Sequence, residues 1–310
     1  MITPLYKGKR GQTRKVRRED GTSEERPVRF DADAAFHTEG GGDRVWGTKY
    51  ALVSTRRPNG RFILAIVDVE KGMDEASAAI EMLRCIKPHA PGAQAVVWDM
   101  ILRGVHINVI LTELGLVAVV GVHAKARSDR TKSRKDDAYI PKTVDLDDIE
   151  VTLPDGTTEI VHLAAHGGWL SVKEINEIGE LYYEHLVCTR IQRHEDRKGF
   201  RFYGYFRLPD TFGSKEIPVR LFQNKEDDAR GINRPENLRA IPEGSEDFAR
   251  LSPLRPDAES INNEIERSLY INRASGKGWR RQMVDLFAHA RLINAITLAR
   301  CRPRERIEAA

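Results

Sequence analysis

The chain has 310 residues, enough for a full hydrophobic core in one large domain or in one domain that carries a long insertion. Its 50 Lys and Arg residues against 46 Asp and Glu residues give a formal net charge of only +4, so overall charge does not indicate a nucleic-acid partner. The three widely spaced cysteines favour a reducing, cytoplasmic location over a disulfide or zinc scaffold, and no apolar run approaches the roughly 20 residues that span a membrane.

Residues 1–26 form a polar, basic segment without apolar periodicity. Such a segment cannot bury apolar surface, so we predict an arm with little structure of its own. The arm could lie along DNA phosphates, or it could be a solvated tail or a linker.

Short β-branched and aromatic runs begin at residue 27. Residues 28–30 are a short strand candidate. Residues 47–54 and 61–68 flank an Asn-Gly dipeptide, which is typical of a tight hairpin turn. We therefore predict that these two runs pair as antiparallel strands.

Two helices and two strands are expected next. Apolar spacing predicts helices over residues 74–86 and 105–114, the second with Val105 turned inward. Residues 95–98 form a short apolar run, and residues 116–122 are apolar on both faces, which is typical of a central strand. The order of elements over residues 27–124 predicts an α/β core, with a mixed sheet covered by helices.

The character of the chain changes in residues 125–250. A basic loop over residues 124–137 comes first, and closely spaced strands with turn residues between them then indicate a β-rich insertion. The predicted strands are residues 149–153, 159–163, 180–190, 200–207 and 217–222. Two helices, residues 257–270 and 280–300, follow within a C-terminal part, residues 251–302, that completes the core.

Two acidic residues stand where functional side chains are expected. Asp99 follows the apolar run at residues 95–98, and Glu259 lies in the first turn of the helix that starts after Pro256. If the apolar stripe of that helix packs on the sheet, Glu259 could point towards Asp99. The stripe consists of Ala258, Ile261, Ile265 and Leu269. Oxygen-rich ligand sets select Mg²⁺ or Mn²⁺, and two such ions can catalyse phosphodiester chemistry.

Residues 95–106, 47–50 and 255–262, taken together in their order, resemble the bacterial DDE transposases. The similarity runs from about residue 27 to residue 302. It implies a ribonuclease H-like mixed sheet flanked by helices and interrupted by a β-rich insertion. It also implies metal-dependent cleavage and joining of double-stranded DNA at the ends of a mobile element by a homodimer, in the bacterial cytoplasm at the nucleoid.

The catalytic residues that the resemblance implies are Asp99 and Glu259, with Asp31 as the third metal ligand and Asp33 as the second choice for that place. A different alignment puts the first catalytic strand upstream of Met1, so that this acid is lost. The family also carries a tyrosine and a lysine where this chain has Ser252 and Glu266. These departures predict weaker DNA handling than in an intact relative.

Several basic residues are predicted to contact DNA phosphates, and binding should therefore depend steeply on salt. They are Arg103, Arg255, Arg267, Lys277 and the basic residues of the 125–135 loop. Arg255 matches the arginine that the family uses to clamp a phosphate. Two other functions remain open: an inactive remnant that retains DNA binding, and a metal-dependent nuclease that hydrolyses DNA without joining it.

Overall fold

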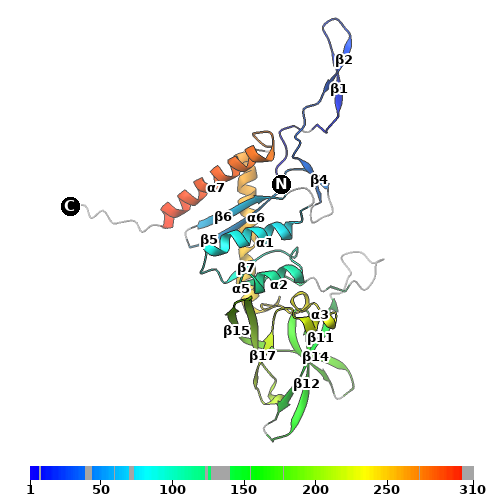
Figure 1. Ribbon diagram of the computed structural model, residues 1–310, viewed down its shortest axis with the longest axis vertical. Coiled ribbons are helices and arrows are strands. Elements are labelled where there is room, and N and C mark those ends of the chain that lie inside the picture. The colour runs from blue at the N-terminus through cyan, green and yellow to red at the C-terminus, as the bar shows by residue number, and fades with distance from the viewer. Residues whose placement is uncertain are drawn as a thin grey trace, which may run out of the picture. The chain divides into compact units, whose positions relative to one another are not determined.

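The protein is known from a computed structural model, in which the chain is mixed α/β with several small sheets (Figure 1). The structure describes residues 1–6, 8–38, 44–58, 60–69, 73–122, 125–126, 140–153, 155–176, 178–271 and 273–301. The chain divides into two compact units, one formed by Met1–Ile86 with Pro256–Ala310 and the other by Lys87–Arg255. The predicted strand and helix at residues 95–114 therefore belong to the same unit as the β-rich insertion.

The first unit is organised around the predicted hairpin, which is confirmed. Strand β5 (Tyr50–Arg57) pairs antiparallel with strand β6 (Gly60–Asp68), and a register shift interrupts the ladder between Val53 and Ser54. Helix α1 (Glu75–Ile86) contacts both strands through an alanine-rich face. Small side chains on that face allow the helix backbone to approach the sheet closely.

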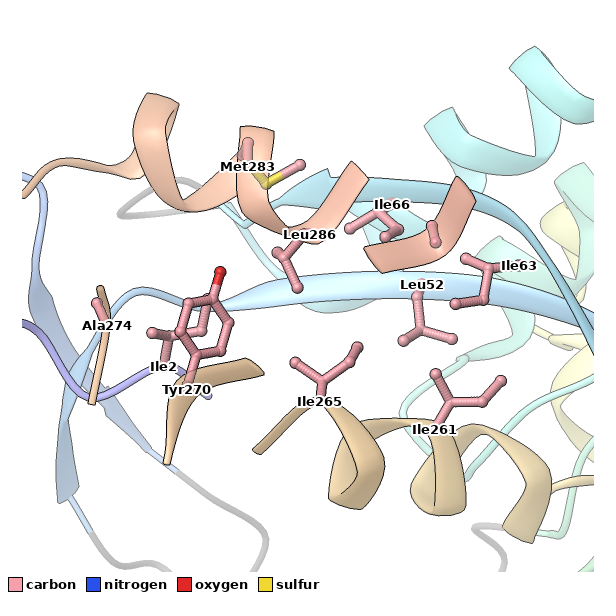
Figure 2. Packing of buried hydrophobic residues seen from close by; sticks show 11 residues of the cluster. Ile2, Leu52, Ile63, Ile66, Ile261, Ile265, Tyr270, Ala274, Met283 and Leu286 are labelled. Atoms are coloured by element: carbon pink, nitrogen blue, oxygen red, sulfur yellow. The ribbon is translucent and has the colours of Figure 1, made fainter. Parts of the chain in front are cut away.

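The other two helices of this unit carry the rest of its core. Helix α6 (Pro256–Glu264) continues into a π-helical segment (Ile265–Tyr270), and helix α7 (Trp279–Cys301) follows. Figure 2 shows how apolar side chains from the hairpin, from α6 and from α7 meet in one cluster. The labelled residues of the cluster are Ile2, Leu52, Ile63, Ile66, Ile261, Ile265, Tyr270, Ala274, Met283 and Leu286.

The apolar stripe predicted for α6 is confirmed up to Ile265. Beyond Ile265, the π-helical segment changes which residue continues the stripe. A π-helix has about one more residue per turn than an α-helix, so the residue aligned with Ile265 is five positions later. Tyr270 is therefore buried at 5% exposure, whereas Leu269, the residue predicted for the stripe, is only partly buried. The Tyr270 hydroxyl donates a hydrogen bond to the Gln282 carbonyl at 2.8 Å, which ties the segment to α7.

The prediction that residues 1–26 have little structure is wrong. Strands β1 (Thr13–Arg17) and β2 (Ser23–Pro27) form an antiparallel hairpin, although neither strand has an apolar face. The strand predicted at residues 28–30 is also wrong, because there only Phe30 makes an isolated bridge, to Gly8. A second small hairpin, β3 (Ala35–Thr38) with β4 (Arg44–Gly47), follows. Backbone pairing and the turn at Asp20 and Gly21 stabilise the first hairpin, whereas the second also has an edge-to-face contact between the Phe36 and Trp46 rings.

The second unit begins with a parallel pair of strands, β7 (Ala95–Val97) and β8 (Val117–Val119), joined through helix α2 (Gly104–Thr112). The strands and the helix are as predicted, with two differences. Strand β8 is fully buried, but among the described strands it pairs only with β7, at the edge of a two-stranded sheet. Val105 is 61% exposed rather than inward, because the buried face of α2 is formed by Gly104, Ile107, Ile110 and Leu111.

The predicted β-rich insertion is confirmed as two antiparallel sheets. One sheet has the order β11-β12-β13-β14 and the other has the order β15-β16-β17. Their bounds are β11 Thr143–Thr152, β12 Thr158–His166, β13 Trp169–Ile175, β14 Leu181–His185, β15 Val187–Asp196, β16 Gly199–Arg207 and β17 Glu216–Arg220. The single strand expected at residues 180–190 is two strands, because the chain changes sheets at Leu186. A short β9–β10 pair (Lys125–Ala126 with Ile140–Pro141) precedes the insertion.

A buried network of ion pairs stabilises the part of the second unit that follows these sheets in the chain. Three short helices, α3 (Lys225–Ala229), α4 (Arg234–Asn237) and α5 (Glu246–Leu251), lie in this part of the chain. Arg234 is fully buried, and its guanidinium lies 2.9 Å from Asp227 Oδ1 and 2.8 Å from Asp147 Oδ2. Because a buried charge is costly unless it is paired, this network fixes α4 against β11.

Candidate catalytic acids and their surroundings

Asp99 lies two residues beyond the end of β7, in the loop that leads to α2. It is half-buried, and its Oδ1 accepts a hydrogen bond from the Ile101 backbone N–H at 3.0 Å. This Asx-type turn is a local structural role that an aspartate commonly takes. Within the described residues, no donor is within hydrogen-bonding distance of Oδ2, so one oxygen of the carboxylate remains able to accept a ligand.

Glu259 lies in the first turn of α6 and is exposed. Its position is set by the neighbouring Asp257, whose side chain is only 11% exposed and lies 3.0 Å from Arg56 Nη2. Arg61 Nη1 also donates to the Asp257 carbonyl at 3.1 Å. The two arginines come from the β5–β6 hairpin, so they attach the first turn of the helix to the sheet on which its apolar stripe packs.

Asp31 has a clear structural role. It is 1% exposed, and its Oδ2 accepts hydrogen bonds from the Gly278 N–H at 3.0 Å and from Gln282 Nε2 at 3.4 Å. Its Oδ1 accepts the Asp33 N–H at 3.2 Å, and Asp33 Oδ2 in turn accepts the N–H of Trp279, the first residue of α7. The two aspartates thus satisfy N–H groups at the start of a helix nearly 250 positions away, where a negative charge is also favoured by the helix dipole.

The three acids differ in how well they suit a hard divalent cation. Carboxylate oxygens are the ligands that Mg²⁺ and Mn²⁺ prefer; Asp99 is half-buried and Glu259 is exposed. Asp31 would have to give up hydrogen bonds to α7 to bind an ion. Within the described residues, no group of three or more His, Cys, Asp or Glu side chains is placed to hold a metal ion.

The residues predicted to contact DNA are distributed over both units. Arg103 is exposed at the start of α2, and its guanidinium lies 3.8 Å from Glu236. Arg255, Arg267 and Lys277 are exposed, and Lys277 Nζ lies 5.8 Å from the centre of the Phe30 ring. Of the 125–135 loop, only the backbone of the short strand β9 (Lys125–Ala126) is described.

Asp257 is the residue whose part in this site the sequence did not reveal. Its place in the first turn of α6 predicts an interaction with the helix dipole alone, whereas the structure makes it a two-arginine anchor. A signal was present, because Arg56 and Arg61 flank the hairpin turn that the sequence predicts. Nothing in the spacing, however, indicates that the turn and the helix meet.

Comparisons with known proteins add no family to this picture. No family model, curated protein or solved structure matches the chain. In the described part of the chain, no helix is both long enough and apolar enough to cross a membrane.

Proposed function

We propose that this chain is the catalytic core of a DDE-type transposase, which cleaves and joins double-stranded DNA with the help of Mg²⁺ or Mn²⁺. The observation that carries the proposal is the first turn of α6. There Glu259 is exposed at the edge of an apolar stripe that packs on the β5–β6 hairpin, and the Asp257–Arg56 ion pair fixes its position. The order of the motifs along the chain is the second support.

Asp99 is the second acid of the proposal. It lies beyond the carboxyl end of a strand in a parallel pair, which is where functional side chains collect in α/β proteins. In the proposal, Asp99 and Glu259 each contribute a carboxylate to the binding of divalent ions. A bound ion of this kind activates a water or a 3′-hydroxyl group and stabilises the leaving oxygen of the phosphodiester. Arg255, next to the start of α6, would bind a phosphate through its planar guanidinium.

Asp31 favours a second candidate, a remnant that binds DNA without cleaving it. In this candidate the third acid is lost, because Asp31 Oδ2 accepts N–H groups at the start of α7 and its Oδ1 accepts the Asp33 N–H. The remnant would keep the basic residues and the fold. It would not bind Mn²⁺ at Asp99 and Glu259 tightly enough to support catalysis.

The test compares Mn²⁺ binding and DNA joining in matched variants. Mn²⁺ binding is measured by isothermal titration calorimetry, and joining is measured with a labelled duplex and a supercoiled plasmid. We expect Asp99→Asn and Glu259→Gln each to abolish both, because each removes an anionic ligand. Glu264→Gln changes the same charge at another exposed position of the same helix and should leave both unchanged.

The outcomes separate the candidate functions. Mn²⁺ binding and joining that require Asp99 and Glu259 support the transposase. Cleavage without joined product indicates a nuclease with the same acids. DNA binding that is indifferent to Mn²⁺ and to both substitutions overturns the catalytic proposal and leaves the remnant.

A further inference from the structure

The β1–β2 hairpin is a ribbon that the core of the protein does not use. Eight of its ten strand residues are exposed, and the other two, Val16 and Glu24, are half-buried. Its turn is well defined: Arg18 N–H donates to Thr22 O at 2.7 Å, Asp20 Oδ1 accepts the Thr22 N–H at 2.9 Å, and Gly21 adopts a φ of 85°. The positive φ suits glycine, and the aspartate closes the turn.

The ribbon is attached to the first unit by the segments on both sides of it. Ile2 is part of the apolar cluster, and its backbone pairs with that of Thr48 in both directions. Gly8 forms a bridge with Phe30, and Val28 N–H donates to Gln12 O at 2.8 Å. The segments that flank the ribbon are thus fixed to the first unit, whereas its strands are exposed and accessible to a partner.

The charge of the ribbon and its flanks is strongly positive, although the charge of the whole chain is nearly balanced. Residues 9–29 contain eight Lys and Arg residues against four Asp and Glu residues. Glu24 is bound by two of the arginines, Arg18 and Arg26, and these hydrogen bonds lower its pKa, with Arg26 as the larger cause. Acids in the ribbon therefore neutralise only part of the positive charge.

The positive charge that the acids of the ribbon do not neutralise lies on strand β1. Arg14 lies directly opposite Arg26 in the ladder, where like charges repel one another, whereas Lys15 lies opposite Glu25. Within the described residues, no carboxylate is within ion-pair distance of Arg14, Lys15 or Arg17. The repulsion would be relieved by an external anion with several charges.

We infer that the β1–β2 ribbon is a DNA-binding element that lies in a groove of the duplex and contacts its phosphates. A two-stranded ribbon has the width that the major groove admits. A protein partner fits less well, because the centre of a protein interface is depleted in charged residues and enriched in aromatic ones, whereas Val16 and Pro27 are the only apolar side chains of these strands. The inference deepens the proposed function, on which it rests for the identity of the nucleic acid.

The test is the salt dependence of duplex binding by the full chain, measured by fluorescence anisotropy between about 50 and 200 mM salt. The ribbon variant combines Arg14→Gln, Lys15→Gln and Arg17→Gln. Loss of each phosphate contact should reduce the slope of log K against log salt by about 1, so we expect a reduction of about 1 to 3 and at least about ten-fold weaker binding at the lower salt. Circular dichroism should be unchanged, because these residues form no ion pair with a described residue.

Two controls make the result specific. Arg197→Gln, Lys198→Gln and Arg207→Gln remove the same charge from exposed positions of the second unit and should reduce the slope less. Arg14→Lys with Arg17→Lys keeps the charge and should retain most of the slope. The inference is overturned if the ribbon variant binds like the wild type, if the two triple variants weaken binding equally, if the wild type does not bind duplex DNA, or if polyglutamate competes as well as DNA.

Failure of this inference is distinguishable from failure of the proposed function. Asp99→Asn should retain the ribbon-dependent slope, because Asp99 lies in the other unit and carries no positive charge. Ribbon-dependent binding without any DNA joining would reject the transposase and keep the ribbon. If joining requires Asp99 and Glu259 but is unchanged in the ribbon variant, the transposase is supported and the role of the ribbon is rejected.

Discussion

Asn294 of α7 pairs with the backbone of Ile63 as a third strand would. Its Oδ1 accepts the Ile63 N–H at 2.8 Å, and its Nδ2 donates to the Ile63 carbonyl at 2.8 Å. One turn later, Thr297 Oγ1 donates to the Arg61 carbonyl at 3.0 Å. The outer edge of β6 is thus satisfied by helix side chains at Arg61 and Ile63, which keeps this part of the edge from pairing with another chain.

The first prediction follows from this pairing. Asn294→Ala should leave both backbone groups of Ile63 without a partner, at a cost of about 1–3 kcal/mol. Hydrogen exchange measured residue by residue should show about ten-fold or greater loss of protection at the Ile63 amide. Asn263→Ala, on an exposed surface of α6, is the control. Unchanged protection at Ile63 would show that the amide pairing contributes nothing.

The second prediction separates the structural and catalytic roles of Asp31. Asp31→Ala should destabilise the start of α7 by about 2–3 kcal/mol, because it leaves the Gly278 N–H and the Gln282 amide unpaired in a buried site. Asp31→Asn keeps one oxygen acceptor and should fold, which thermal unfolding can check. We expect Asp31→Asn to bind Mn²⁺ like the wild type, whereas Asp99→Asn should not. A folded Asp31→Asn protein that has lost Mn²⁺ would instead identify Asp31 as a ligand.

The third prediction concerns the buried network of the second unit. Arg234→Met should cost about 3–5 kcal/mol, because Asp227, itself fully buried, would lose one of its two arginines. Increased sensitivity of residues in this unit to limited proteolysis is the measurement. Arg250→Met is the matched control, since among the described residues Arg250 forms an ion pair only with the exposed Asp247. Equal proteolysis of the two variants would contradict the prediction.

The fourth prediction is a pH dependence in the sheet β11-β12-β13-β14. Burial lowers the pKa of His166, which stacks on Tyr183 and lies 2.8 Å from the Thr143 hydroxyl. Burial, and secondly the charge of His166, also lower the pKa of His185. The unfolded chain then binds these protons more tightly than the folded one. Stability is therefore fully present above the unfolded pKa of about 6.5 and is lost as pH falls from there through the folded pKa.

Hydrogen exchange of the β12 and β13 amides at neutral pH and at about pH 5.5 would measure this loss. His166→Phe keeps an aromatic ring on Tyr183 and should reduce the pH dependence, leaving the part due to His185. His89→Phe, at an exposed position outside the sheet, should leave it unchanged. A pH dependence of the same size in all three proteins would assign the effect to other groups.

The sequence predicted best those elements whose signal is local. The Asn-Gly turn and the alternation around it gave the β5–β6 hairpin, and helical spacing gave α1, α6 and α7. The ribbon was missed because its strands are polar on both faces. Two further errors have a cause that the sequence pattern does not show. Leu186 is 2% exposed and donates its N–H to Leu170 O, so the strand predicted at residues 180–190 is divided between two sheets. The π-helical segment places Tyr270 instead of Leu269 at the end of the apolar stripe.

By itself, then, the sequence determined the types of most elements, because apolar period and turn chemistry act over a few residues, and it predicted the two acids on which the functional proposal depends. Only the tertiary structure decided that Asp31 binds the start of α7 and that Asp257 anchors α6 to Arg56 and Arg61. Those contacts join residues about 200 or more positions apart. An aspartate carries no local pattern that distinguishes a helix cap, an ion-pair anchor and a metal ligand, because the same carboxylate serves each role and its neighbours in space select among them.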